Sequence, residues 1–275
     1  AVGFIRKHKD RPFFVYLPFY AVHTPIQAKA DLTAEYAKRK PAGGHRNPKY
    51  AAMIQTMDEG VGRVLKTLAD LQLQGRTVVI FTSDNGGLGG YGSLGGSTGR
   101  RITDNSPLRG GKGMLYEGGI RVPLIVRWPG RTAPGSVCRT PVITVDFYPT
   151  LSAIAGAKRP VSQVADGRSF LPLLKGAPLP PRSLFWHFPG YLQANARTGT
   201  WRTTPAGAIR RGRFKMIEFF EDGRRELYDL DDDISERNDL AGTQPERAKE
   251  LYSQLTEWRH KVRAPLPTAK PKTRP

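Results

Sequence analysis

The chain has 275 residues, enough to bury a substantial core as one large domain or as one large and one small domain. Its 43 Lys and Arg residues against 24 Asp and Glu residues give a net charge of +19, which indicates an anionic partner: nucleic acid, an acidic polymer or an anionic surface. A single cysteine, Cys138, excludes an intramolecular disulfide framework, and no apolar run approaches the length of a membrane span.

The amino-terminal part predicts a helix end, a strand and a loop. Residues 1–9 carry apolar side chains followed by a basic run, as in the last turns of an amphipathic helix. Residues 13–17 (FFVYL) predict a buried strand. His23 follows in a loop punctuated by prolines, where an imidazole either reaches a ligand or is simply solvated. Residues 31–49 are polar and basic and predict a surface excursion.

The next stretch predicts a strand–helix–strand unit. Residues 48–73 have apolar side chains at three- and four-residue spacing, which predicts the longest helix of the chain, closed by Gly75. The apolar run at residues 77–81 has no polar alternation and predicts a strand buried on both faces. Together with the strand at 13–17, this order predicts a βαβ unit in a parallel sheet with helices on its faces.

Two oxygen-bearing side chains, Asp84 and Asn85, follow this second strand and precede Gly86 and Gly87. Open α/β sheets bind ligands beyond the carboxyl ends of their strands, and glycines allow the sharp turn that a small site needs. A carboxylate and an amide oxygen there could bind a hard cation. The alternative is an Asx-turn that only ends the strand.

The following segment predicts a glycine-rich loop and a candidate ligand-binding lysine. Residues 86–99 lack the spacing of a nucleotide-binding loop and predict a mobile rim of a site. Lys112 lies between glycines, so the backbone could approach a ligand closely; the alternative is a solvated lysine in a turn. Residues 120–128 predict a third strand, and residues 148–155 a short helix.

The carboxyl-terminal third predicts a small α+β subdomain. Prolines and glycines accumulate over residues 159–182 and mark a boundary. Short strands, a turn at 221–223 and an amphipathic helix follow, while residues 264–275 are Pro- and Lys-rich without periodicity and predict disorder. The strands are expected at 183–188, 208–211, 214–220 and 226–230, and the helix at 245–262.

Four stretches in this order resemble type I sulfatases of the alkaline phosphatase superfamily: residues 21–27 (AVHTPIQ), 78–87 (VVIFTSDNGG), 106–130 (SPLRGGKGMLYEGGIRVPLIVRWPG) and 208–241. The resemblance implies an α/β fold with an alkaline-phosphatase-like, mostly parallel sheet flanked by helices, and a small carboxyl-terminal α+β subdomain with an antiparallel sheet and one helix. It divides the chain into the carboxyl-terminal part of the catalytic domain, the subdomain and a disordered basic tail, at residues 1–180, 181–263 and 264–275.

The resemblance also implies a site. Asp84 and Asn85 match residues that bind one divalent cation, most often Ca²⁺, with Mg²⁺ as the alternative. Lys112 and His23 match residues that contact the sulfate group of the substrate, and are the catalytic residues expected. Trp186 and His187 could form a wall facing a sugar ring; the alternative is a buried tryptophan beside a hydrogen-bonded histidine.

Parts of the family pattern are missing from the 275 residues: the nucleophile motif, the early paired aspartates that complete the metal shell, and a second histidine and lysine. The family nucleophile is a formylglycine made from a Cys/Ser-x-Pro/Ala-x-Arg motif, and Cys138 lies in SVCRTP, which does not match. The expectation is a formylglycine upstream of residue 1, and an inactive chain without it. The resemblance also leads us to expect a periplasmic or secreted protein that acts on an anionic sulfated substrate, a sulfated carbohydrate or an aryl sulfate, and not on nucleic acid.

Two alternatives stay open at this point. One is a phosphatase or phosphodiesterase of the same superfamily, although such enzymes usually carry more Asp and His ligands than the five dispersed histidines here provide. The other is a non-catalytic protein that binds acidic polysaccharide through its basic surface.

Overall fold

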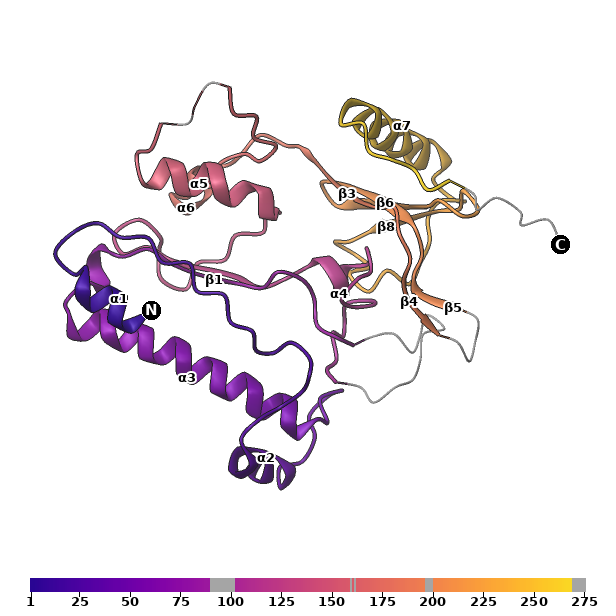
Figure 1. Cartoon of the computed structure of the whole chain (residues 1–275). Coiled ribbons are helices and arrows are strands. Elements are labelled where there is room, and N and C mark those ends of the chain that lie inside the picture. Colours follow the sequence, from indigo (N-terminus) through magenta and orange to yellow (C-terminus); the bar gives the residue numbers. More distant parts are fainter. Residues whose placement is uncertain (90–101, 159, 161, 196–199, 269–275) are drawn as a thin grey trace. The chain divides into compact units, whose positions relative to one another are not determined.

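The computed structural model describes residues 1–89, 102–158, 160, 162–195 and 200–268 (Figure 1). The chain forms two compact units: Ala1–Ser83 with Pro123–Leu179, and Asp84–Val122 with Pro180–Pro275. The carboxyl-terminal part of the second unit begins at residue 180. The second unit also contains residues 84–122, which the sequence-based division assigned to the first domain. Most of the predicted glycine-rich loop at 86–99, and the end of the predicted tail, lie outside the described residues.

The first unit is built around its longest helix. Its elements are α1 (Val2–Lys7), α2 (Ala30–Ala37), α3 (Pro48–Asp70), η1 (Gln74–Arg76), β1 (Val79–Thr82), β2 (Leu124–Arg127), η3 (Thr144–Asp146), α5 (Phe147–Ile154) and α6 (Leu171–Leu174). The side chain of Asn47 caps α3 by accepting a hydrogen bond from the Tyr50 N–H at 3.1 Å, and Pro48 starts the helix without losing an N–H partner. Ile5, Leu68 and Leu73 form the buried cluster between α1 and α3.

Among the described residues of the first unit, the predicted parallel strand–helix–strand arrangement is not formed. β1 pairs with β2 in antiparallel register, from Val79 opposite Arg127 to Thr82 opposite Leu124. Residues 13–17 belong to no strand ladder. An apolar run indicates that a segment is buried. It does not indicate whether a partner strand is present or in which direction that strand runs, so the parallel pairing could not be predicted from it.

The side chains of residues 13–17 nevertheless alternate. Phe13 and Val15 pack against the cluster of α1 and α3, whereas Phe14 and Tyr16 are exposed. β1 is also only half-buried, and not buried on both faces as predicted. The α2 helix was missed because it has only eight residues, none of them buried, and so gives only a weak amphipathic pattern.

The second unit is dominated by antiparallel strands. Its elements are α4 (Glu117–Ile120), β3 (Ser183–Phe188), β4 (Leu192–Asn195), β5 (Thr200–Thr203), β6 (Ala206–Arg211), β7 (Phe214–Phe219), β8 (Arg225–Asp229) and α7 (Pro245–Lys261). One sheet has the order β3-β6-β7-β8, and β4 and β5 pair separately (Figure 1). The predicted subdomain with one antiparallel sheet and one long helix is therefore present.

The two faces of the four-stranded sheet have different coverings. Because side chains alternate along a strand, Met216 and Ile217 point to opposite faces of β7. Met216 packs with the apolar side of α7, where Leu251 and Leu255 are fully buried. Ile217 packs with Met114 and Tyr116, which belong to the loop that carries Lys112. The sheet therefore lies between a helix and the candidate site loop.

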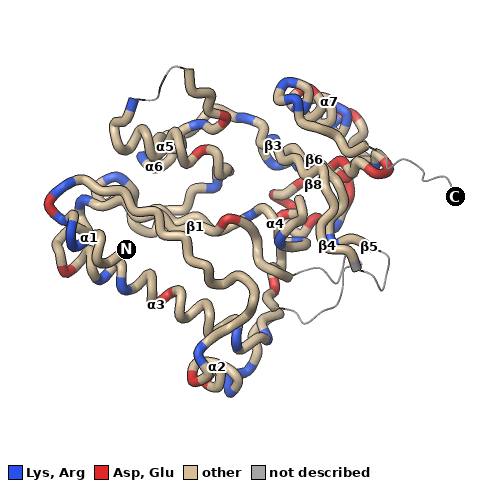
Figure 2. The backbone as a smooth tube through the Cα atoms, in the orientation of Figure 1, with Lys and Arg blue, Asp and Glu red and all other residues tan. Residues whose placement is uncertain are grey.

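The positive charge is spread over both units. Figure 2 shows Lys and Arg along most segments, with several around α2. The basic residues directly after α2 are Lys38, Arg39 and Lys40, and all three are exposed. No helix in the described part of the chain is long and apolar enough to span a membrane.

Candidate active site

The candidate cation ligands lie in a turn immediately after residue 83. The side-chain amide of Asn85 donates to the carbonyl of Gly86 at 2.9 Å, which fixes the orientation of the amide group. Asp84 is exposed, and no described residue forms a hydrogen bond or ion pair with its carboxylate. An exposed carboxylate beside a fixed amide oxygen fits part of the shell of a hard cation.

The shell is only partial. Among the described residues, no group of three or more His, Cys, Asp or Glu side chains is arranged to hold a metal ion. Asp84 and Asn85 supply two oxygen donors, whereas Ca²⁺ takes about six to eight. A complete shell would need further oxygen ligands from water, from the substrate or from other residues of the protein.

The turn of Asp84 and Asn85 is hydrogen-bonded to the loop that carries Lys112. The N–H of Gly86 donates to the carbonyl of Gly119 at 2.9 Å, and the N–H of Lys112 donates to the carbonyl of Gly87 at 3.0 Å. Two direct backbone bonds therefore hold the candidate cation ligands and the candidate sulfate-binding lysine in one local structure. That these three residues bind a cation and a sulfate group in one site stays a prediction.

Glycines make this close contact possible. A Cβ on Gly86 would come within 1.8 Å of the Gly118 carbonyl oxygen, and a Cβ on Gly111 within 2.1 Å of the Gly89 carbonyl oxygen. Gly113 adopts a φ of +90°, which side chains rarely allow. The glycines around Lys112 were predicted to permit close approach of a ligand; in the structure they permit close approach of two backbone segments.

His23 belongs to the first unit, so its position relative to Lys112 stays a prediction. It is exposed, and its backbone N–H donates to the Tyr20 carbonyl at 2.9 Å. Its Nδ1 lies 2.7 Å from the carbonyl of Thr24. Since a carbonyl only accepts, Nδ1 carries the proton there, and Nε2 is the ring nitrogen left for a ligand.

The predicted aromatic wall of Trp186 and His187 is not formed. The two residues are neighbours in β3 and therefore point to opposite faces of the sheet. Trp186 packs beside Ile217 on the loop-covered face, while Nε2 of His187 lies 2.7 Å from the carbonyl of Pro265. This arrangement corresponds to the alternative of a packed tryptophan and a hydrogen-bonded histidine.

Sequence reasoning missed a buried ionic cluster that supports the Lys112 loop. The ammonium of Lys215 on β7 lies 3.0 Å from Oε1 of Glu117 and 2.8 Å from Oε1 of Glu236. All three side chains are at most 2% exposed. Arg210 and Arg121 lie 3.8 and 3.4 Å from the other oxygen of Glu117. Each residue lies in a stretch quoted for the family resemblance, but their convergence depends on the tertiary fold.

The cluster shifts the two carboxyl groups in opposite directions. Burial alone would raise the pKa of Glu117, but Lys215, Arg210 and Arg121 outweigh it and hold that pKa below its ordinary value. Burial raises the pKa of Glu236, and the opposing effect of Lys215 only partly compensates. Glu117 is thus the firmly ionised partner of Lys215.

A second polar group flanks the same loop. Arg109 donates to the hydroxyl of Tyr228 at 2.9 Å and to the carbonyl of Glu236 at 2.8 Å. The hydroxyls of Tyr116 and Tyr228 both donate to Oε2 of Glu226, at 2.7 and 2.8 Å. Burial, followed by the nearby Glu226 charge, raises the pKa of both phenols, so both stay protonated donors.

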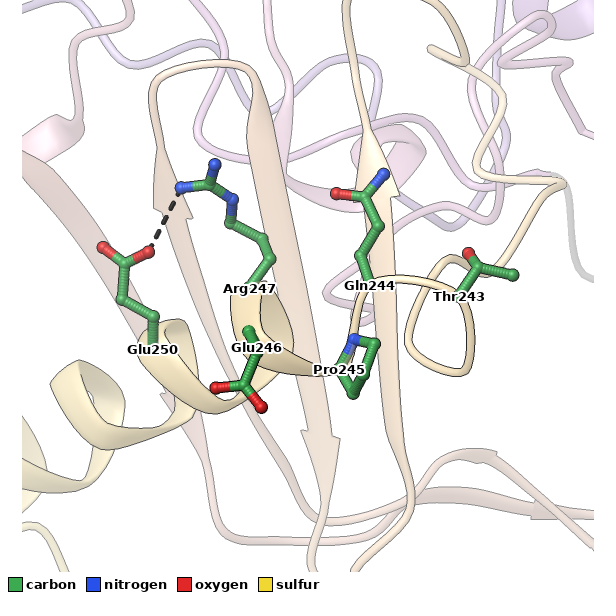
Figure 3. A pocket seen from close by; sticks show the side chains of 6 residues that line it. All are labelled: Thr243, Gln244, Pro245, Glu246, Arg247 and Glu250. Atoms are coloured by element: carbon green, nitrogen blue, oxygen red, sulfur yellow. Dashed lines mark hydrogen bonds and ion pairs between the residues drawn. The ribbon is translucent and has the colours of Figure 1, made fainter.

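Two other features carry none of this chemistry. A shallow hollow at the start of α7 is lined by Thr243, Gln244, Pro245, Glu246, Arg247 and Glu250, with Arg247 donating to Glu250 at 3.1 Å (Figure 3). It contains none of the predicted site residues. Cys138 is an exposed free thiol, as expected for a cysteine outside the family motif.

Two known protein families match the chain. The family description "Sulfatase" matches residues 1–157, and "N-sulphoglucosamine sulphohydrolase, C-terminal" matches residues 111–264. A sulfatase of Formosa agariphila is 39% identical over 291 residues, covering 96% of this chain and 49% of the relative.

Solved structures agree. The crystal structure of Ps i-CgsB has a TM-score of 0.75 at 30% identity, covering 94% of this chain and 52% of that chain. It has also been solved in complex with k-i-k-neocarrahexaose. BT4656, solved with D-glucosamine-2-N,6-O-disulfate, has a TM-score of 0.62 at 28% identity, covering 78% and 40%. The chain spans about half the length of these proteins, and it belongs to the sulfatase family, with the α/β fold of the alkaline phosphatase superfamily.

Proposed function

We propose that the complete protein is a sulfuric ester hydrolase acting on sulfated carbohydrate, with its cation and sulfate site at Asp84, Asn85 and Lys112. The observation that carries this proposal is the pair of backbone bonds that join the turn of Asp84 and Asn85 to the Lys112 loop. Two solved relatives are in complex with a neocarrahexaose and a glucosamine disulfate, which supports a carbohydrate substrate.

The chemistry needs positive charge at two places. A sulfate ester carries negative charge on its oxygens, and the leaving oxygen gains more as the S–O bond breaks. Ca²⁺ or Mg²⁺ bound at Asp84 and Asn85 would act as a Lewis acid toward a sulfate oxygen. The ammonium of Lys112 would bind the sulfate group as a point charge, and Nε2 of His23 would stabilise or protonate the leaving oxygen.

The nucleophile is the remaining requirement. We propose a formylglycine outside these 275 residues, because Cys138 lies in SVCRTP and does not match the family motif. On this proposal the 275-residue chain alone hydrolyses no sulfate ester, and the complete protein is periplasmic or secreted. Sustained hydrolysis by the chain alone, lost in Cys138→Ala, would assign the nucleophile to Cys138 instead.

The test uses the complete protein, a chromogenic aryl sulfate, and a sulfated oligosaccharide. Lys112→Ala should lower kcat by about 100-fold or more, since it removes a charge that acts in the transition state. Asp84→Ala should abolish one Ca²⁺ site in titration calorimetry. Lys175→Ala, an exposed lysine after α6, is the matched control and should match the wild type.

Two results would reject the proposal. One is wild-type turnover of sulfate esters by Lys112→Ala together with unchanged Ca²⁺ binding by Asp84→Ala. The other is a clear preference of the wild-type protein for the corresponding aryl phosphate, which would favour the phosphatase alternative.

A further inference from the structure

Three separate parts of the second unit meet at one buried point. Glu117 follows Lys112 in the site loop, Lys215 lies at the centre of β7, and Glu236 lies in the segment between β8 and α7. Nζ of Lys215 bridges the two carboxylates at 3.0 and 2.8 Å, with all three side chains buried. The contact joins residues 98 positions apart in the sequence, between Glu117 and Lys215.

Glu236 also binds the backbone of the loop. Its Oε2 accepts the N–H of Glu117 at 2.7 Å, and its own carbonyl accepts a bond from Arg109 at 2.8 Å. Glu236 has a φ of +52°, in the left-handed region that a glutamate rarely adopts. The contacts of Glu236 must hold this backbone in place, because the conformation is unfavourable for a residue other than glycine. One residue therefore holds both ends of the loop from Arg109 to Glu117.

The segment held in this way contains Lys112. Its N–H donates to Gly87, next to the turn of Asp84 and Asn85. A displacement of the loop would change the position of the ammonium and lengthen this bond. Buried ion clusters are weak contributors to net stability, because desolvation offsets the attraction between the charges, and their better-supported use is to specify one geometry.

We propose that Lys215 and Glu236 are positioning residues, which hold the Lys112 loop in register with the cation-binding turn. This inference rests on the proposed function, because it assigns the carboxyl-terminal sheet a part in the sulfatase site. Glu236 and Lys215 themselves do not contact substrate; they act through Glu117 and the backbone of the loop.

The sheet offers a matched control on its other face. Arg259 of α7 donates to Oε2 of Glu218 on β7 at 2.7 Å, and both side chains are largely buried. Glu218 lies on the same strand as Lys215 but points toward α7. Glu218→Gln thus removes one charge from a buried ion pair without touching the Lys112 loop.

The experiment compares Glu236→Gln with Glu218→Gln in the complete enzyme, with rates divided by the folded fraction. A glutamine cannot accept from Lys215 and from the Glu117 N–H at once, because its amide nitrogen is a donor. Glu236→Gln should therefore lower kcat on an aryl sulfate by about 10- to 100-fold with little change in KM. Glu218→Gln should keep the wild-type kcat per folded enzyme.

A double mutant tests whether Glu236 acts through Lys112. In a Lys112→Ala background, Glu236→Gln should lower kcat by no more than about 2-fold, because residues that work as one unit are not additive. Equal kcat losses in Glu236→Gln and Glu218→Gln, or full additivity with Lys112→Ala, would overturn the inference while leaving the proposed function intact. A wild-type enzyme without sulfatase activity would instead reject the proposed function.

Arg109→Lys is the second variant, for the case in which Glu236→Gln does not fold. It keeps the positive charge, but the lysine side chain ends one atom short of the arginine Nη1, which donates both to Tyr228 and to the Glu236 carbonyl. It should show the same loss of kcat with unchanged KM and the same non-additivity. A wild-type kcat in Arg109→Lys would count against the positioning role.

Discussion

The two faces of the β3-β6-β7-β8 sheet are stabilised in different ways. Toward α7, Ile209, Met216 and Leu227 meet the apolar side of a helix whose Leu255 is fully buried. Toward the site loop, the same strands present Lys215, Glu226 and Tyr228, which bind Glu117, Arg109 and Tyr116. One face therefore supplies stability through buried apolar area, while the other supplies geometry through charge and hydrogen bonds.

The largest effect is expected at the centre of the ionic face. Lys215→Met leaves Glu117 and Glu236 buried together without their ammonium, which should cost about 3–5 kcal/mol of unfolding free energy at neutral pH. Loss of the ammonium would raise both carboxyl pKa values, so the folded variant binds more protons than the folded wild type as the pH falls. The cost should therefore shrink as the pH falls, as measured by urea unfolding of the chain at several pH values. A destabilisation that does not change with pH would contradict the conclusion that charge stabilises this face of the sheet.

The apolar face should respond without a pH signature. Leu255→Ala removes a fully buried side chain of α7 and should cost about 2–5 kcal/mol. Because no ionisable group changes its environment, the same loss is expected across the pH range in urea unfolding. Turnover per folded molecule of the complete enzyme should stay at the wild-type value. A fall in kcat at constant folded fraction would show that the two faces are not separate in function.

A smaller effect is expected when the charge of Glu117 is removed. Its pKa is held below the ordinary value of 4.5, so it contributes stability that is present above that value and is lost as the pH falls through the folded pKa. Glu117→Gln should cost about 1–3 kcal/mol near neutral pH, and the difference from wild type should narrow in acid.

Four charged groups surround Glu117, and each enters this prediction: Lys215, Arg210, Arg121 and Glu236. Glu236 works in the opposite sense, since its raised pKa makes its ionisation unfavourable in the folded state. Removing the Glu117 charge should also lower the pKa of Glu236. An increasing cost of Glu117→Gln at low pH would contradict the assigned direction.

The smallest effect is expected on the outside of α7. Glu250 pairs with Arg211 and Arg247 at 3.1 Å, but all three side chains are about half exposed. Water screens such pairs, so Glu250→Gln should change the unfolding free energy by no more than about 0.5 kcal/mol. A loss comparable to that of Lys215→Met would show that burial is not what separates these ion pairs.

Elements whose signals are local could be predicted from the sequence. Residues 48–73 predicted the helix found at Pro48–Asp70, and residues 245–262 the helix found at Pro245–Lys261. The turn at 221–223 lies between β7 and β8 as predicted, with Gly223 at a φ of +70°. Helical periodicity, capping and turn chemistry act over a few residues, so they can be read without the fold.

Some candidate site residues could also be picked out from the sequence. Asp84, Asn85 and Lys112 stood out because polar groups beside glycines follow a strand or interrupt a loop. Their direct connection through Gly86 and Gly119 could not be read, because nothing in either segment specifies the other.

Only the tertiary structure decided which distant residues meet. The antiparallel pairing of β1 and β2 depends on the path of the chain between them, and not on their apolar composition. Likewise, Lys215 and Glu236 resemble ordinary surface charges in the sequence. Their role appears only when the fold buries them beside Glu117, because burial and long-range pairing, not residue type, make a charge structural.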